Sequence, residues 1–287
     1  MPEPLSQSLP DPLSEPLPDP LPDPVSDPLS DPLGDLTARL RAAGSVCAED
    51  EAALLLDAAP DRSENLEALV VRRLGGEPLE QVLGWADFAG VRVRLLPGVF
   101  VPRQRTALLV DLAAAVLAPG DVVVDLCCGS GALLAALLER RPGAIGHAGD
   151  LDATAVACAR LNLSPHSVHQ GDLYDALPDH LRGRIDVLVV NAPYVPTAAI
   201  AQLPPEARDH EPHLALDGGP DGLDLHRRVA RGACAWLAPD GMLLIEVSPG
   251  QLSAAMALLA RAGLVPEAVE DPERAALAVR ARPRRLE

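Results

Sequence analysis

The segment Asn191-Ala192-Pro193-Tyr194 directly follows the apolar run 187–190. Its residue types suit methyl transfer to a planar amide or aryl-amine nitrogen, which is a poor nucleophile because its lone pair is delocalised. The Asn191 side-chain oxygen and the Ala192 carbonyl can accept the two N–H hydrogen bonds of such a nitrogen, and Tyr194 can stack on the planar group. Positioning of this kind can lower a barrier by about 7–11 kcal/mol. We therefore treat Asn191, Ala192, Pro193 and Tyr194 as candidate catalytic residues, although a plain Asn/Pro turn after a strand would look the same.

A glycine-containing turn, Asp125-Leu126-Cys127-Cys128-Gly129-Ser130-Gly131, follows the apolar run 122–124. Glycines let the backbone approach a ligand, and the helix that follows presents free N–H groups. The turn lacks the Gly-Lys-Ser/Thr of a phosphate-binding loop and is not a full G-x-G-x-x-G motif. Taken alone, it fits a simple strand-to-helix turn equally well.

Two further acids support a nucleotide-like ligand at this turn. Asp150 ends the next expected strand about 20 residues later, where an acid accepts hydrogen bonds from ribose hydroxyls. Asp172 ends the third, where it or its neighbour Leu173 could meet an adenine. Three successive strands with such endings predict an adenosine-containing cofactor. The candidate cofactor-binding residues are Asp125, Cys127, Cys128, Gly129, Ser130, Gly131, Asp150, Asp172, Leu173 and Asn191.

These residues need a sheet that brings strand ends together. Continuous apolar strands that alternate with amphipathic helices predict an α/β fold with a mostly parallel, Rossmann-like sheet covered on both faces, which binds ligands beyond the carboxyl ends of its strands. The expected strands are 121–127, 144–150, 166–170, 185–191, 241–247, 264–270 and 275–281, and the expected helices are 130–140, 152–162, 222–237 and 250–262.

The segments before this sheet predict a different organisation. Acids recur every fourth residue beside prolines in the first 35 residues, which favours a disordered, polyproline-like tail. Three short helices are expected next, and Asp61 or Ser63 can cap the third of them. A hairpin and then a helix near 104–117 are expected after these helices. The expected division is a tail at 1–35, a helical substrate-recognition domain at 36–84, a hairpin linker at 85–110 and a catalytic domain at 111–287.

Composition limits the class of protein. The 287 residues carry 24 basic residues, all of them Arg, against 41 acids, for a net charge of -17, so a broad nucleic-acid surface is disfavoured. Five cysteines without CxxC spacing indicate reduced thiols and a cytoplasmic protein, with no disulfide frame. The two histidines of His210-Glu211-Pro212-His213 lack a third ligand, so no metal is expected. No apolar run reaches the roughly 18 residues of a membrane span.

From Arg72 to Leu277 the sequence resembles the HemK-like protein-(glutamine-N5) methyltransferases, the group that includes PrmC. The motifs that carry the resemblance are Gly76-Glu77-Pro78-Leu79, Phe88-Ala89-Gly90, Val99-Phe100-Val101-Pro102-Arg103, the turn from Asp125 to Gly131, Asn191-Ala192-Pro193-Tyr194, and the stretch from Glu211 to Leu223. The resemblance implies a class I methyltransferase fold and S-adenosylmethionine as the cofactor. Asp150 would hold its ribose, Asp172 and Leu173 its adenine, and the turn its methionine part. The segment from Asn191 to Tyr194 would grip a glutamine on a protein of the translation machinery, such as a release factor or a ribosomal protein.

Three departures from the family pattern bear on the function. Ala192 replaces the usual proline, and Cys127 replaces the first glycine of the turn, which is tolerable if its dihedral angles are ordinary. Gln104-Arg105-Thr106-Ala107 stands where the family shows acid-Thr-Glu. A divergent member with another protein substrate would explain them. A nucleic-acid amino-methyltransferase shares the Asn-x-Pro-Tyr motif and is the alternative, and a non-catalytic adenosine-binding scaffold is the third interpretation.

Overall fold

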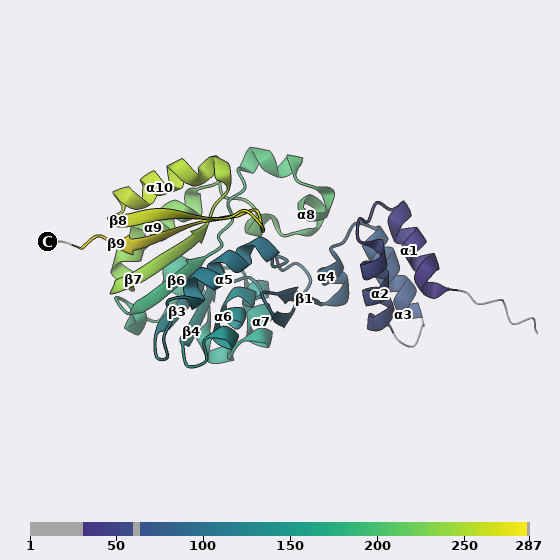
Figure 1. Ribbon diagram of the computed structural model, residues 1–287, viewed down its shortest axis with the longest axis horizontal. Coiled ribbons are helices and arrows are strands. Elements are labelled where there is room, and N and C mark those ends of the chain that lie inside the picture. Colours follow the sequence, from purple (N-terminus) through teal and green to yellow (C-terminus); the bar gives the residue numbers. More distant parts are fainter. Residues whose placement is uncertain (1–30, 60–63, 286–287) are drawn as a thin grey trace, which may run out of the picture. The chain divides into compact units, whose positions relative to one another are not determined.

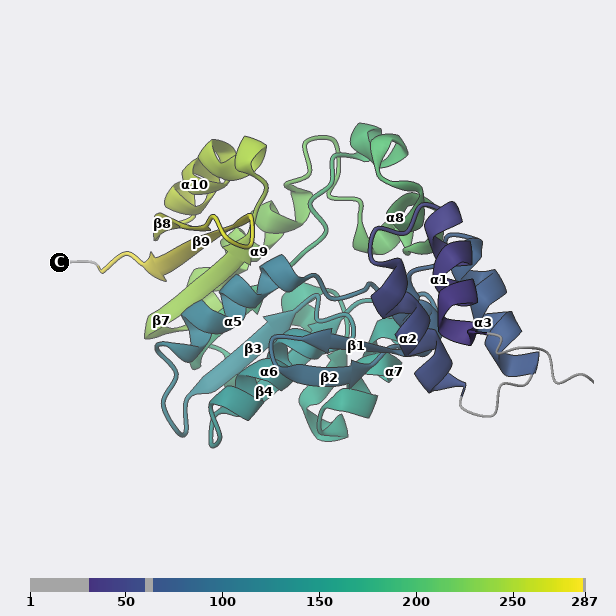
Figure 2. The same cartoon turned by 45° about the vertical axis from the view of Figure 1, so that its right-hand side comes forward.

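A computed structural model describes residues 31–59 and 64–285 (Figures 1 and 2). The chain divides into two compact units, one that ends at Ala52 and one that begins at Ala53. This division falls inside a helix and not at residue 84, where the sequence predicted the end of a helical domain. The four predicted domain ranges therefore remain predictions.

The first unit contains α1 (Pro32–Ala42) and the beginning of α2 (Ala48–Ala58). Leu36 and Leu40 are buried, as their helical spacing predicts. The predicted tail lies largely outside the described residues, and its last residues, 32–35, belong to α1, which begins at Pro32. Proline is compatible with the first turn of a helix, where its missing N–H would have no partner within the helix.

After the end of α2, the second unit continues with two helices and a hairpin. They are α3 (Glu64–Leu74), α4 (Leu79–Leu83), β1 (Trp85–Phe88) and β2 (Val91–Arg94). The cap predicted at Asp61 or Ser63 lies outside the described residues. Arg72 joins α3 to α4, because its guanidinium donates to the Glu77 carboxylate at 2.8 Å and to the Gln81 carbonyl at 3.0 Å. The hairpin was predicted, and α4 was not.

A seven-stranded sheet forms the body of this unit, in the order β5-β4-β3-β6-β7-β9-β8. The five strands from β5 to β7 are parallel, whereas β9 runs antiparallel to both β7 and β8. This confirms the mostly parallel sheet and all seven predicted strands. The strands are β3 (Val122–Leu126), β4 (Ile145–Asp150), β5 (Val168–Gln170), β6 (Ile185–Val190), β7 (Leu237–Glu246), β8 (Leu264–Asp271) and β9 (Ala276–Pro283).

Helices cover both faces of the sheet, and Figures 1 and 2 show the two layers. One face packs on α5 (Ala107–Ala114), α6 (Ala132–Arg140) and α7 (Ala153–Asn162), and the other on α9 (Asp224–Trp236) and α10 (Leu252–Arg261). Alternate residues of each central strand enter opposite cores, because side chains alternate across a strand. Burial on both faces explains why these strands read as continuous apolar runs.

The sequence analysis predicted no helix or strand between β6 and α9. It contains 3-10 turns at Thr197–Gln202 and His213–Ala215 and the short helix α8 (Pro205–His210) between them. Residues 195–197 pair with 216–219 through backbone hydrogen bonds. Within the described ranges, every helix is too short or too polar to cross a membrane.

Candidate active site

A cavity of about 520 Å³ lies at the carboxyl ends of the parallel strands and holds both predicted motifs. Its volume is in the range of pockets that bind small molecules and cofactors. Nearly all the residues predicted from the sequence line it. They are Asp125, Cys127, Cys128, Gly129, Ser130, Asp150, Asp172, Leu173, Asn191, Ala192, Pro193 and Tyr194.

Gly131 is the exception, because its role in the structure is packing. Its φ is +76°, and a Cβ there would lie 2.8 Å from the Leu163 Cδ1 atom. Gly131 therefore lets α6 start close to α7 and does not line the cavity.

The glycine turn differs from the expectation at Cys127. This residue has φ +60°, in the left-handed region that glycine occupies at no steric cost, so the condition under which the cysteine was judged tolerable, ordinary dihedral angles, is not met. Gly129 has φ +54° and donates its N–H to an Asp150 carboxylate oxygen at 2.9 Å. The turn thus keeps the conformation of a glycine turn although cysteine occupies its first glycine position.

The carboxylates at the strand ends face an environment with few compensating donors. Asp125 is 1% exposed, one of its oxygens has no hydrogen-bond partner among the described residues, and burial together with the Asp150 charge raises its pKa to about 8. Burial also raises the pKa of Asp150, although its two oxygens accept from the N–H groups of Gly129 and Asp152, each at 2.9 Å. A ligand that brings hydrogen-bond donors or positive charge would therefore be favoured here.

The third strand end is arranged differently from the first two. Asp172 forms an ion pair with Arg228 at 2.8 Å, which occupies one of its carboxylate oxygens. Its neighbour Leu173 is buried and has φ +52°. Because Leu173 lines the cavity with an apolar side chain, it is better placed than the paired Asp172 carboxylate to contact a planar base.

A hydrogen-bonded network surrounds Asn191 and Tyr194 and centres on Glu246, at the end of β7. The Glu246 carboxylate accepts from the Thr106 hydroxyl at 2.6 Å, from the Arg105 Nε at 3.0 Å and from the Tyr194 hydroxyl at 3.0 Å. Arg105 also donates to the Tyr194 oxygen at 2.7 Å, and Asn191 donates its Nδ2 to the Thr106 oxygen at 3.2 Å. Burial and the Glu246 charge raise the pKa of Tyr194 to about 12, so its hydroxyl keeps its proton at neutral pH.

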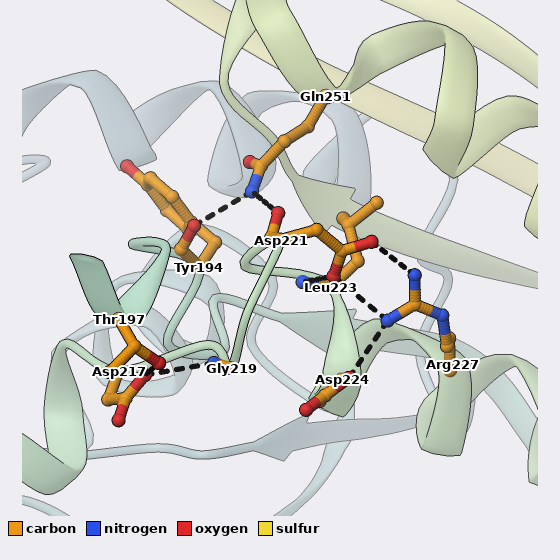
Figure 3. Close-up of polar contacts among 9 residues, drawn as sticks. All are labelled: Tyr194, Thr197, Asp217, Gly219, Asp221, Leu223, Asp224, Arg227 and Gln251. Atoms are coloured by element: carbon orange, nitrogen blue, oxygen red, sulfur yellow. Dashed lines mark hydrogen bonds and ion pairs between the residues drawn. The ribbon is translucent and has the colours of Figure 1, made fainter. Parts of the chain in front are cut away.

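A hydrogen bond from the Gln251 side chain fixes the backbone of Tyr194 (Figure 3). The Gln251 side-chain nitrogen donates to the Tyr194 carbonyl at 2.8 Å and to the Asp221 carbonyl at 3.1 Å. Figure 3 also shows Asp217 bound to Thr197 and Gly219, at 2.7 and 2.9 Å. These contacts fix the loop 217–223 against the segment that follows Asn191.

Comparisons with known proteins agree with this geometry. Residues 90–203 match the family model of the methyltransferase small domain. A release factor glutamine methyltransferase of Bradyrhizobium diazoefficiens is 37% identical over 270 residues, which cover 85% of this chain and 89% of the relative. The chain belongs to the release factor glutamine methyltransferase family.

One further relative has the same name, and one solved structure shows the fold. A release factor glutamine methyltransferase of Streptomyces coelicolor is 42% identical over 62% of this chain and 65% of its own length. The crystal structure of a methyltransferase from Pyrococcus furiosus aligns with a TM-score of 0.50 and 15% identity over 76% of this chain and 98% of its own, which shows the shared fold.

The methyltransferase uses S-adenosylmethionine, which supplies an electrophilic methyl group when bound. The residues at the strand ends fit this cofactor. The unpartnered oxygen of Asp125 and the desolvated Asp150 favour a ligand with a cationic sulfonium, an ammonium group and ribose hydroxyls. Leu173 and the turn at Cys127 and Gly129 line the same cavity and would provide apolar and backbone contacts for its other parts.

Sequence reasoning did not assign Arg105, Thr106 and Glu246 of this network, nor Gln251, which supports the Tyr194 backbone. Glu246 ends an apolar run, which is the signal that identified Asp125 and Asp150, so that rule could have found it. Arg105 was noted only as a departure from the family pattern. Within the part of the chain that the structure describes, no group of three or more His, Cys, Asp or Glu residues is arranged to hold a metal ion.

Proposed function

We propose that this methyltransferase transfers a methyl group to the side-chain amide nitrogen of a glutamine in a protein, and that the protein is a peptide-chain release factor. The observation that carries the proposal is that Asn191 and Tyr194 line the same cavity as Asp125 and Asp150. The names of the similar proteins from two bacteria support the substrate class.

The residues of the motif act by orientation. Asn191 Oδ1 and the Ala192 carbonyl accept the two N–H bonds of the glutamine amide, which turns the nitrogen lone pair toward the methyl group. The nitrogen then takes the methyl group that the cofactor would supply, and its proton passes to solvent as positive charge develops on it. A strong base is therefore not required beforehand. Positioning of this kind can supply up to about 7–11 kcal/mol of the barrier.

The charge of the chain supports a protein substrate over a nucleic acid. The net charge of -17 disfavours a polyanion, and Arg103, one of the arginines of the cavity wall, is paired with the buried Glu211 at 2.5 Å. The segment that carries α8 contributes the apolar side chains of Leu203 and Leu214 to the cavity lining, and such side chains suit contact with a peptide loop.

Radiolabelled S-adenosylmethionine tests the proposal. The purified protein is incubated with a release factor and with extract from cells that lack the enzyme, and labelled protein is separated from nucleic acid. We expect label on one glutamine of the release factor, mapped by mass spectrometry. Label on another protein would correct the substrate, label in RNA or DNA would support the alternative function, and cofactor binding without transfer would support a scaffold.

The variant Asn191→Ala tests the role of the carboxamide. Transfer should fall at least about a hundredfold, the scale seen when one preorganised polar group is removed from an active site. Cofactor affinity, measured by calorimetry, should change little. Asn65→Ala, which removes an exposed carboxamide on α3 that does not line the cavity, is the matched control. Equal activity of Asn191→Ala and the parent protein would refute the assignment.

A further inference from the structure

An asparagine can present either its oxygen or its nitrogen to a ligand, because a half-turn of the carboxamide exchanges the two. The proposed reaction requires the Asn191 oxygen, an acceptor, to face the substrate. If the Asn191 NH₂ group faced the glutamine NH₂ group, two donors would meet and no hydrogen bond would form. A residue that fixes the orientation of the Asn191 carboxamide would therefore control the reaction without touching the substrate.

The hydrogen bonds around Asn191 permit one direction of donation. Glu246 is buried, with its side chain 5% exposed, and its carboxylate only accepts. The Thr106 hydroxyl, 2.6 Å away and itself buried, has one proton and donates it to Glu246. The Thr106 oxygen can then only accept from Asn191, 3.2 Å away, so the Asn191 NH₂ group must face Thr106.

The other carboxylate oxygen of Glu246 also accepts hydrogen bonds, and its donors are Arg105 and Tyr194. Arg105 has donors only, so the Tyr194 oxygen accepts from it at 2.7 Å and the Tyr194 proton is directed to Glu246 at 3.0 Å. Both oxygens of Glu246 are thus occupied by donors. In the described part of the chain, no residue donates to Asn191 Oδ1, which is left for a ligand.

We propose that Glu246, acting through the Thr106 hydroxyl, is the positioning residue that orients the Asn191 carboxamide with its oxygen toward the substrate. This inference rests on the proposed function for its consequence in catalysis. The orientation of the carboxamide itself is a property of the free enzyme and can be measured without a substrate.

Selective ¹⁵N-asparagine labelling provides that measurement, because the chain contains three asparagines, Asn65, Asn162 and Asn191. Three side-chain amide signals are expected, and Asn191→Asp assigns one of them by its loss. Thr106→Val keeps the size of the side chain but removes its hydroxyl, so it should move the Asn191 amide signal. Thr106→Ser keeps the hydroxyl and should leave the signal near its original position. Asn162 is the internal control and should not respond.

The same variants test the consequence for catalysis. Thr106→Val should lower kcat at least tenfold with cofactor affinity unchanged within about threefold, and Thr106→Ser should recover most of the activity. Glu246→Gln should also lower kcat at least tenfold, because a glutamine amide can donate to Thr106 and free its proton for Asn191. Glu267→Gln, which changes an exposed carboxylate paired with Arg280, is the matched control and should have parent activity.

The outcomes separate this inference from the proposed function. An Asn191 signal that does not move in Thr106→Val would overturn the inference whatever the enzyme methylates. Equal kcat in Thr106→Val and Thr106→Ser would overturn it as well. If the parent enzyme transfers no methyl group to a glutamine, the proposed function fails, and the amide signals still decide whether Glu246 and Thr106 orient Asn191.

Discussion

Gly222 packs directly behind the Tyr194 backbone, and replacing it with alanine should disrupt the loop that supports the site. Gly222 has φ +76°, and a Cβ there would lie 2.2 Å from the Tyr194 carbonyl oxygen and 2.3 Å from the Gln251 side-chain nitrogen. Neither neighbour can remain in place. Since Gln251 joins Tyr194 to Asp221 (Figure 3), the contact that must open is the one that fixes Tyr194.

The expected loss of stability has two parts. A left-handed conformation costs a residue with a Cβ about 1–2 kcal/mol relative to glycine. The two Gln251 hydrogen bonds contribute about 1 kcal/mol each and are lost or weakened when the backbone moves. Gly222→Ala should therefore lower the free energy of unfolding by about 3 kcal/mol or more. Gly183→Ala isolates the first part, because Gly183 has φ +72° and no atom within 4 Å of the added Cβ.

Urea unfolding followed by tryptophan fluorescence compares the two variants, since Trp236 is buried on α9 in the same unit. Gly183→Ala should lose about 1–2 kcal/mol and keep its methyl transfer. Gly222→Ala should lose clearly more, and the part that still folds should show a reduced kcat. Equal destabilisation of the two proteins would refute the inference that Gly222 and Tyr194 are in close contact.

Three other changes test the cofactor turn, the ribose site and the sheet edge. Asp150→Ala should weaken S-adenosylmethionine binding, measured by calorimetry, at least tenfold, which is about 1.4 kcal/mol. Asp240→Ala, which changes an exposed carboxylate, is the control and should bind like the parent protein. Unchanged affinity of Asp150→Ala would show that Asp150 does not bind the cofactor. Cys127→Gly should raise the free energy of unfolding by up to about 1 kcal/mol, because relief at φ +60° outweighs the added chain entropy, and a loss would contradict this. Burial lowers the pKa values of His147 and His169, whose ring nitrogens lie 3.2 Å apart. As the pH falls, the unfolded chain therefore binds protons at these histidines at a higher pH than the folded chain does. The free energy of unfolding is therefore unaffected by this pair above pH 6.5, the ordinary pKa of histidine. Below that pH it falls by up to about 1.4 kcal/mol per pH unit for each proton. His169→Gln should flatten that dependence in urea titrations at pH 5.5 and 7.5, and an unchanged slope would exclude the pair.

The parallel sheet was predictable because its strands are buried on both faces, which leaves continuous apolar runs in the sequence. The ends of β3 and β6 were predictable for the same reason, since Asp125 and Asn191 interrupt those runs abruptly, whereas Asp150 was identified at the end of a predicted strand about 20 residues after the glycine turn. The cavity then follows from topology alone, because parallel strands bring their carboxyl ends to one edge.

Residues whose role depends on a distant partner could not be predicted in this way. Arg105 and Glu246 are separated by 141 positions, and no local pattern indicates that they meet. The start of α1 at Pro32 was missed because the periodic prolines before it indicate extended chain, whereas a proline in the first turn of a helix carries no such meaning. The φ of Cys127 was left open by the sequence, because residue type favours an ordinary φ, whereas the turn between β3 and α6 imposes the left-handed one.

The three departures, at Cys127, at Ala192 and at 104–107, are the only support for a non-catalytic scaffold, and the structure gives the last two another explanation. An arginine at 105, where the family shows an acid, is paired with a carboxylate that is almost fully buried and would be costly to leave without a partner. Thr106, which the family pattern retains, is the residue that links this pair to Asn191. Ala192 is 1% exposed and keeps the carbonyl that the reaction needs, while Gln251 supports the following backbone at Tyr194. A chain that had lost catalysis would have no reason to keep a charge-balanced network around an asparagine whose oxygen is left for a ligand, so the departures are better explained as compensated changes within a working active site.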